Sequence, residues 1–577
     1  MKESSGLFTL VAVTISLLAT VKLSGQSSPA DSTPTFRTTT RLVSVDVVAT
    51  DSKGHPVTDL KQPDFTVKEE GNQEELRVFS FQQPAASSTV KASAQPEPPA
   101  NVFGNLRRTR ITGPLNVLLL DGINTRMNNQ DFVKSQVLEF LKKVPADQPL
   151  AIYLLGQKLQ LLQDFTSDPE VLKKVIEQFK APHSPLMDNA AGGIQRFWLE
   201  GVPLPPNLKR QVLDFQQQTE SAQMDQRVSL TVAAFRTLAH TLAGYPGRKN
   251  LIWVSEAFPI TLIPTKIMFG ESGARATRFY NNPAVEIANL LADAHIAVYP
   301  VDARALVHTY AYDPSVRFDP RGNGVSPGQA ASDLQDELQP VHAAMEQMAE
   351  DTGGRASYNR NDIDDAIRQD MNDGSTYYTL GYYPQKKNWD GKFRKISVQV
   401  NRRGVKLRYR LGYFAMDPAK GSLPDKQREM EFSDNLSPDQ PAATQMIFEA
   451  AISPPSEKTS NKVAVFFAVD PQTVTFIQED NGNQKARLQC AARIFTSAQD
   501  NHPLKTEAED VDADLSPENM ARVARSGVPC RASFDLPPGE YFIRLGIRDL
   551  QSGRIGTANA YLKVPALKQQ ERERTQH

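Results

Sequence analysis

Alternation of strand and helix patterns over about 300 residues is the feature that most constrains how this chain folds. Leu115–Leu120 (LNVLLL) is a continuous apolar run, which is typical of a parallel strand buried on both faces. A helical pattern follows at Phe132–Lys143, and a second strand pattern at Ala151–Leu155. The same order of elements continues to about residue 301. This repetition predicts an α/β domain at 112–415, with a doubly wound, mainly parallel sheet and helices on both faces.

Two Pro/Gly-rich insertions interrupt the alternation, at 182–225 and 305–335. The pattern also changes at the end of the domain, where three segments look like consecutive antiparallel strands: Tyr377–Tyr383, Lys395–Val400 and Val405–Tyr413. We place these three strands in the α/β domain.

The flanking regions have a different composition. Valines alternate with polar residues near the start of 39–82, which predicts a small β module. Residues 83–111 are rich in Pro, Ala and Ser and form a linker. Short strand patterns separated by turns return at 443–565, where we expect a C-terminal β-sandwich. Residues 566–577 form a charged tail.

The first residues carry an export signal. The apolar run Leu7–Thr20 is about 14 residues long, whereas crossing a bilayer takes about 20. Small residues follow it at Ser24–Gly25, as at a cleavage site, so residues 1–26 are predicted to be a signal peptide. An uncleaved anchor is the alternative. Since no second long apolar run occurs, the mature chain should lack a transmembrane segment and be periplasmic, outer-surface or secreted.

Composition excludes several classes of function. The chain has 577 residues, with 65 basic and 66 acidic side chains, so it has no general attraction for nucleic acid. No His-Glu-x-x-His zinc-hydrolase motif occurs. The two cysteines, Cys490 and Cys530, both lie in or beside strand patterns, and an exported protein meets an oxidising compartment. We expect a disulfide between them, with two buried free thiols as the alternative.

Oxygen-bearing side chains follow the predicted strands of the α/β domain. Asp121 and Thr125 come after the first strand, Thr166 lies in the loop before the second long helix, and Glu256 ends a later strand. Ligands of open α/β sheets bind outside the carboxyl ends of the strands. The sequence therefore predicts that these residues meet there.

Several stretches resemble a known family. They are SVDVVATDSKGHPVTDL and DFTVKEEG before the domain, LLLDGINT at the first strand, and YYTLGYYP with ISVQVNRRGVKLRYRLGYF at its end. As a set they resemble the von Willebrand factor type A (VWA) domain, and more closely the VWA-related family described from acidobacteria. The resemblance covers roughly residues 39–415.

The resemblance implies a metal-ion-dependent adhesion site. Asp121 matches its leading Asp, Thr125 its second Ser and Thr166 its Thr, while Glu256 stands near its last Asp. Ile123 replaces the first Ser and removes one hydroxyl ligand. A divalent cation, Mg²⁺ or Mn²⁺, would be held there, with water and an acidic side chain of the partner completing its coordination. The alternative is a lapsed site in which Asp121 and Thr125 only cap the following helix.

The function implied is exported and non-enzymatic: adhesion to an unidentified protein or surface polymer through a degenerate metal site. The alternatives are a structural cell-envelope protein with a lapsed site, or an extracellular hydrolase. No catalytic residues are predicted, because the Gly324–Gly328 string (GVSPG) lies in a Pro/Gly loop and Pro327 has no N–H to donate. Asp121→Ala is expected to abolish cation and partner binding with the fold intact, and Ile123→Ser to strengthen cation binding.

Overall fold

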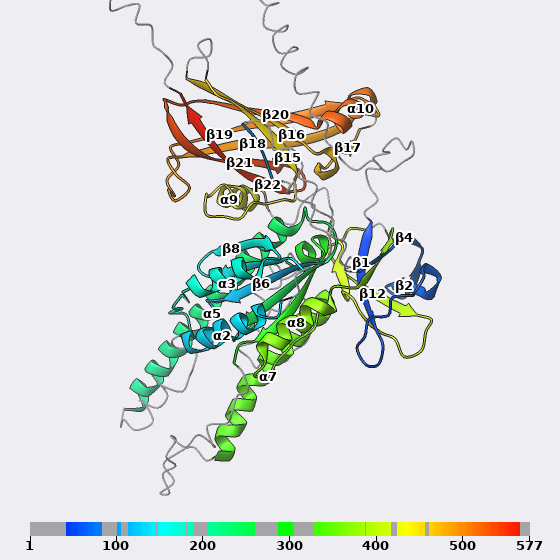
Figure 1. Ribbon diagram of the computed structural model, residues 1–577, viewed down its shortest axis with the longest axis vertical. Coiled ribbons are helices and arrows are strands. Elements are labelled where there is room, and N and C mark those ends of the chain that lie inside the picture. The colour runs from blue at the N-terminus through cyan, green and yellow to red at the C-terminus, as the bar shows by residue number, and fades with distance from the viewer. Residues whose placement is uncertain are drawn as a thin grey trace, which may run out of the picture.

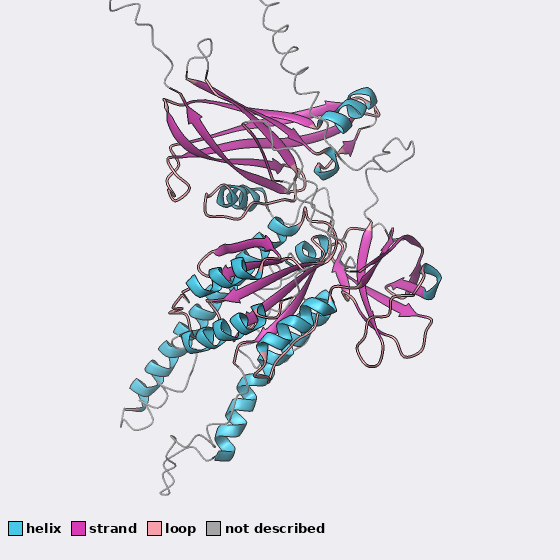
Figure 2. Ribbon diagram, viewed as in Figure 1, coloured by secondary structure: helices cyan, strands magenta, loops and turns pink. Residues whose placement is uncertain are grey.

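The computed structural model has a central α/β domain between two β-sandwiches (Figures 1 and 2). It describes residues 42–83, 101–105, 114–144, 148–180, 182–187, 205–259, 287–304, 327–386, 388–416, 424–455, 461–479 and 481–565. The predicted signal peptide, most of the predicted linker, the GVSPG string apart from its last two residues, and the charged tail lie outside these residues. Among the described residues, no helix combines the length and the apolar character needed to cross a membrane.

The central domain is built on a five-stranded sheet in the order β10-β9-β6-β7-β8. Its strands are β6 (Leu115–Asp121), β7 (Leu150–Leu155), β8 (Leu159–Thr166), β9 (Lys249–Ser255) and β10 (Ile296–Asp302). Only β8 is antiparallel to its neighbour. Every residue of the four parallel strands is buried, which explains their continuous apolar runs. Beyond β10, Ser357 forms a single parallel bridge with Val301, in the place of a sixth strand.

Helices cover both faces of this sheet, as expected. They are α2 (Met127–Leu141), α3 (Pro169–Gln178), α5 (Pro206–Leu242), α7 (Pro327–Thr352) and α8 (Ile363–Asp373). Helices α2, α3 and α8 share one hydrophobic core with the sheet, and α5 and α7 share the other. The N-terminal ends of α5 and α7 project beyond the sheet (Figure 1), so each predicted insertion contains the start of a long helix.

The N-terminal sandwich takes its strands from the predicted small β module and from the end of the predicted α/β domain. One sheet has the order β13-β1-β11-β4 and the other β14-β12-β2-β3. The early strands are β1 (Val43–Thr50), β2 (Phe65–Glu69), β3 (Asn72–Glu74) and β4 (Leu76–Gln82), with a 3-10 turn, η1 (Gln62–Asp64), before β2. The late strands are β11 (Tyr377–Tyr382), β12 (Phe393–Val400), β13 (Lys406–Arg408) and β14 (Gly412–Phe414). The late strands therefore complete the small β module instead of ending the α/β domain.

The C-terminal sandwich also recruits a distant segment. One sheet contains β5 (Val102–Gly104), β15 (Phe448–Ser453), β16 (Lys462–Val469) and β20 (Val528–Asp535). The other contains β17 (Ile477–Gln478), β18 (Gln484–Phe495), β19 (Lys505–Leu515), β21 (Gly539–Asp549) and β22 (Ile555–Val564), and the unit also holds η3 (Pro471–Thr473) and α10 (Pro517–Ser526). Strand β5 lies inside the predicted linker, so that segment is partly structural. A disulfide joins Cys490 on β18 to Cys530 on β20 and links the two sheets, with Cα atoms 6.4 Å apart.

A helix absent from the sequence-based prediction, α9 (Asp425–Asn435), lies beside the C-terminal sandwich. Its Phe432 packs with Leu436 in a small core that includes residues of that sandwich. On its other side, Glu431 lies 3.4 Å from Arg236 and 3.6 Å from His240, both on α5. Burial raises the pKa of Glu431 to about 7. Helix α9 therefore connects the C-terminal sandwich to the α/β domain.

Candidate functional site at the carboxyl edge of the central sheet

The strand order reverses beside β6, the first strand of the domain, which lies between β7 and β9. In open α/β sheets the crevice outside the carboxyl ends of the strands, at such a reversal, is where ligands bind. Asp121 is the last residue of β6, and Ser255 the last of β9, followed by Glu256. The structure brings Asp121, Thr125 and Glu256 together at this edge.

The Asp121 carboxylate is buried and fully hydrogen-bonded. One oxygen, Oδ1, accepts from the backbone N–H groups of Ile123 (3.0 Å) and Asn124 (2.9 Å). The other, Oδ2, accepts from the Asn124 amide (2.9 Å), Trp253 Nε1 (2.9 Å) and the Ser255 hydroxyl (2.8 Å). Burial raises the pKa of Asp121, and these hydrogen bonds oppose the rise. With five donors on two oxygens, no lone pair is left for a further ligand.

The Glu256 carboxylate, 2% exposed, is held by the loop after β6. Its Oε2 accepts from the backbone N–H of Arg126 (2.9 Å) and from the Asn129 amide (2.9 Å). Its Oε1 lies 2.6 Å from Nε of Arg126. The Thr125 hydroxyl accepts from the backbone N–H of Glu256 (3.2 Å). A guanidinium of the chain itself therefore neutralises this acidic side chain.

Thr166 does not belong to this site, contrary to the sequence-based expectation. It pairs with Leu150, at the start of β7, whereas Asp121 pairs with Leu155 at the end of β7. Thr166 therefore lies at the opposite edge of the sheet, because β8 runs antiparallel and reverses which edge its end reaches. Its hydroxyl accepts from the backbone N–H of Asp168, which caps helix α3.

Ser184 supplies the hydroxyl that reaches the crevice from a third loop. It is buried in the segment 182–187, and its Oγ donates to the carbonyl of Ile123 (2.8 Å). The Gln130 amide connects the loop after β6 to the segment 182–187, because it donates to the carbonyls of Thr125 (2.7 Å) and Pro182 (3.1 Å). The sequence analysis missed Ser184, although its signal was a hydroxyl between prolines just after a predicted helix.

Ile123, in the position of the missing hydroxyl ligand, is 6% exposed and belongs to the hydrophobic core. Its replacement by Ser would remove an apolar side chain from that core as well as add an oxygen. The expected gain in cation binding would therefore be accompanied by a loss of stability.

The residues at this edge do not fit a divalent cation. A hard cation needs oxygen lone pairs directed at it, about six in all for Mg²⁺. Asp121 and Glu256 direct theirs at N–H and O–H donors and at Arg126. Within the described part of the chain, no group of three or more His, Cys, Asp or Glu residues could hold a metal ion. The Mg²⁺ or Mn²⁺ expected from the resemblance therefore has no ligand set here.

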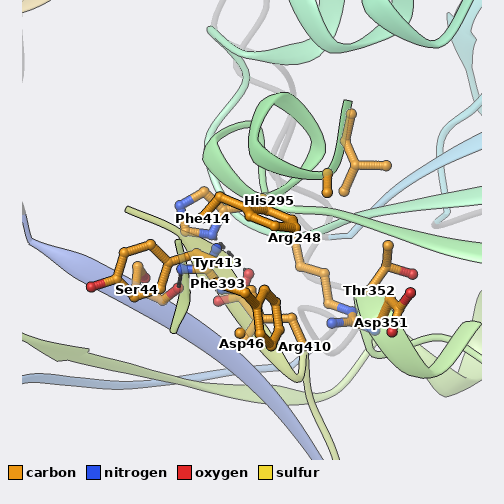
Figure 3. Close-up of a pocket in the computed structure, with 14 residues that line it drawn as sticks. Ser44, Asp46, Arg248, His295, Asp351, Thr352, Phe393, Arg410, Tyr413 and Phe414 are labelled. Carbon is orange, nitrogen blue, oxygen red and sulfur yellow. Dashed lines mark hydrogen bonds and ion pairs between the residues drawn. The ribbon is translucent and has the colours of Figure 1, made fainter. Parts of the chain in front are cut away.

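A second polar cluster lies at the opposite, amino edge of the sheet, where the N-terminal sandwich contacts the α/β domain (Figure 3). His295 Nδ1 lies 2.8 Å from Asp46 Oδ2, and the Thr379 hydroxyl donates to Asp46 Oδ1 (2.7 Å). Burial opposes ionisation of Asp46, yet the hydrogen bond and charge of His295 lower its pKa overall. The cavity there is about 30 Å³, room for two or three waters.

The strand order defines an open, doubly wound α/β domain, with hydrogen-bonded polar residues at the carboxyl edge of its sheet. No protein-family model matches the sequence, and no curated protein is significantly similar to it. Solved structures give weak matches. An aerotolerance-related membrane protein from Bacteroides fragilis is 11% identical, with 45% of this chain and 99% of that chain covered and a TM-score of 0.24.

Two further matches are of the same kind. The PilB minor pilin from Streptococcus sanguinis is 9% identical, with 45% of this chain and 62% of that chain covered and a TM-score of 0.24. A von Willebrand factor type A protein from Catenulispora acidiphila is 8% identical, with 87% and 76% covered and a TM-score of 0.19. TM-scores this low do not establish a common fold, so the architecture rests on the strand order itself.

Proposed function

We propose that this chain is an exported, non-enzymatic binding protein whose VWA-like domain holds a partner protein or surface polymer at the carboxyl edge of its sheet. The motifs LLLDGINT and YYTLGYYP support a VWA-like domain, and within that class the acidobacterial VWA-related family. The disulfide between Cys490 and Cys530 supports export, because such bonds persist in oxidising compartments.

One observation carries the proposal: short loops hold a cluster of charged side chains at the edge of the sheet where the strand order reverses. Asp121 and Glu256 are each held by several hydrogen bonds, which makes the edge rigid and preorganised for recognition. The Ser255 hydroxyl donates to Asp121 and is 2.8 Å from the Ala257 carbonyl, so it is engaged in structure and not poised as a nucleophile.

Because the ligand set does not fit a cation, we propose that partner binding is independent of metal. This differs from the metal-dependent adhesion that the resemblance implied. Arg126 takes the place of the cation beside Glu256. Chelation should then leave binding unchanged, whereas changes at the crevice itself should abolish it.

The test uses site-specific photo-crosslinking in the full chain. Met127, the first residue of α2, is 50% exposed beside the crevice, and Tyr561 on β22 is 66% exposed on the C-terminal sandwich. A photoreactive residue at position 127 should give one major adduct in an envelope preparation, with and without EDTA, whereas position 561 should not give that adduct. The same adducts from both positions, or none, would favour the structural role. Loss of the adduct with EDTA would contradict independence from metal.

A further inference from the structure

Arg227 is a buried guanidinium with weak hydrogen-bond acceptors. It lies on α5 beside the carboxyl edge and is 5% exposed. Its Nη1 donates to the sulfur of Met187 (2.9 Å) and its Nη2 to the sulfur of Met224 (3.5 Å), while its Nε has no hydrogen-bond partner in the described ranges. Thioether sulfur is a poor acceptor, so most of the hydrogen-bonding capacity of this guanidinium is unused.

The charges of the nearby carboxylates attract Arg227, but these carboxylates do not accept its hydrogen bonds. Burial lowers the pKa of Arg227, and the charges of Asp121 and Glu256 only partly oppose this. The lone pairs of Asp121 accept from five other donors, and Glu256 is held by Arg126. A buried charge without matching hydrogen bonds is costly. Within the part of the chain that the structure describes, no carboxylate accepts a hydrogen bond from Arg227.

A second unused polar atom lies at the same edge of the sheet, on Asn124, which contacts α5. The Asn124 amide nitrogen donates to Asp121 (2.9 Å) and to the hydroxyl of Thr231 (3.0 Å), one turn after Arg227 on α5. The amide oxygen of Asn124 is buried and has no hydrogen-bond partner among the described residues. The carboxyl edge thus offers a guanidinium that needs an acceptor and an amide oxygen that needs a donor.

We infer that Arg227 is the anion-receiving group of this site and that it binds a carboxylate on an acidic peptide segment of the partner. A peptide supplies both missing groups, a carboxylate for Arg227 and an N–H donor for Asn124. A singly charged carboxylate fits better than phosphate or sulfate, because Asp121, close enough to act on the charge of Arg227, repels the second charge of a dianion. The inference rests on the proposed function, since it names the partner chemistry of the same edge.

One of the two methionines that contact Arg227 is exposed. Met224, whose sulfur accepts from Nη2 of Arg227, is 40% exposed, whereas Met187 is buried. Methionine is unbranched and flexible, so it adapts to different bound surfaces. Displacing the Met224 thioether would uncover the guanidinium without moving the backbone of α5.

The experiment measures binding of two blocked peptides to the full chain by calorimetry: acetyl-Gly-Asp-Gly-amide and acetyl-Gly-Asn-Gly-amide. The Asp peptide should bind the wild type at least tenfold more tightly than the Asn peptide. Arg227→Gln should remove this preference, and Arg227→Lys should restore only part of it, because lysine cannot bind a carboxylate with two parallel hydrogen bonds. Arg210→Gln, an exposed arginine on the same helix, is the matched control and should behave as wild type.

A second variant keeps the test decisive if Arg227→Gln folds poorly. Met224→Glu places a carboxylate one turn from Arg227 and should block the Asp peptide and raise the melting temperature, whereas Met224→Gln should do neither. Equal binding of both peptides, no binding by the wild type, or full competition by sulfate at constant ionic strength would overturn the inference. If position 127 crosslinks to a partner but the chain binds both peptides equally, only the inference about Arg227 is overturned. If the chain prefers the Asp peptide but position 127 gives no adduct, only the proposed function is overturned.

Discussion

The two edges of the central sheet both bury charged groups, but they satisfy them differently. At the amino edge the partners come from another unit: Asp46 of β1 faces His295, and the hydroxyl of Tyr377 on β11 accepts from the backbone N–H of Arg248 (2.9 Å). At the carboxyl edge the acidic groups are held by loops of the same domain, and Arg227 keeps unused donors. The amino edge is therefore an internal interface between two units, and the local origin of the contacts at the carboxyl edge is consistent with the proposed partner surface there.

The largest expected effect is the loss of Asp121. Its 3% exposure and five donors contradict the expectation of an intact fold, which assumed a surface position. Asp121→Ala should lower the free energy of unfolding by about 3–5 kcal/mol, since several buried donors lose their acceptor. Urea unfolding measures this. Asp168→Ala, at the exposed cap of α3 on the opposite edge, should cost only about 1 kcal/mol, and equal losses would contradict the comparison.

The amino edge should show its own dependence on pH through Lys249. Its ammonium donates to the Ala294 carbonyl (2.7 Å), and burial lowers its pKa to about 7. At a pH between that value and the unfolded pKa of about 10.4, Lys249 is protonated in the unfolded chain and neutral in the folded chain. The free energy of unfolding should therefore rise with pH in this range, by at most about 1.4 kcal/mol per pH unit. Below pH 7 this contribution should be flat. Lys249→Met should remove this rise in stability. If the variant shows the same pH profile as the wild type, the rise comes from another titratable group.

A double-mutant cycle tests whether the amino edge is an interface that couples two units. Asp46 and His295 belong to different units and form an ion pair when His295 is protonated. The variants Asp46→Asn and His295→Asn, singly and together, should give a coupling energy of about 1 kcal/mol. Asparagine suits position 295 because its φ is 54°, in the left-handed region. Strictly additive losses would show that the contact does not couple the two units.

The smallest expected effect concerns divalent cations at the carboxyl edge. A ligand that binds the folded state raises the melting temperature, and one without a site does not. Addition of Mg²⁺ or Mn²⁺ at millimolar concentration should leave the melting temperature unchanged within about 1 °C, and so should EDTA. A rise that saturates with Mn²⁺ concentration would reveal a site among the oxygens at this edge.

The central sheet was predictable because its signal is local. A run such as LNVLLL can only be buried on both faces, and the carboxyl ends of parallel strands meet at one edge. That reasoning placed Asp121, Thr125 and Glu256 together correctly. It misplaced Thr166, because the direction of an edge strand such as β8 depends on pairing and not on hydrophobic periodicity.

The other wrong predictions also arose because contacts between residues far apart in the sequence decide the structure. The strands at 377–414 were assigned to the α/β domain, but their pairing partners β1, β2 and β4 lie about 300 residues earlier. Arg227 was overlooked because arginine is normally exposed, and nothing in its sequence neighbourhood indicates burial. Arg126 was overlooked because Glu256, with which it pairs, lies 130 positions later. Their role follows only from the carboxylates that the fold brings beside them.

The return of the late strands to the first sandwich has a consequence for biogenesis. The backbone N–H of Leu60 donates to the hydroxyl of Tyr378, 318 positions later. At about 5–20 residues per second, the ribosome takes on the order of tens of seconds to add that span. During this time β1 and β4 lack the late strands that pair with them, and β2 is paired only with β3. Their open edges are liable to wrong pairing during this time. The nascent chain should therefore depend on a holding chaperone until residue 414 has emerged, and a fragment covering only 112–415 would lack half of its first sandwich.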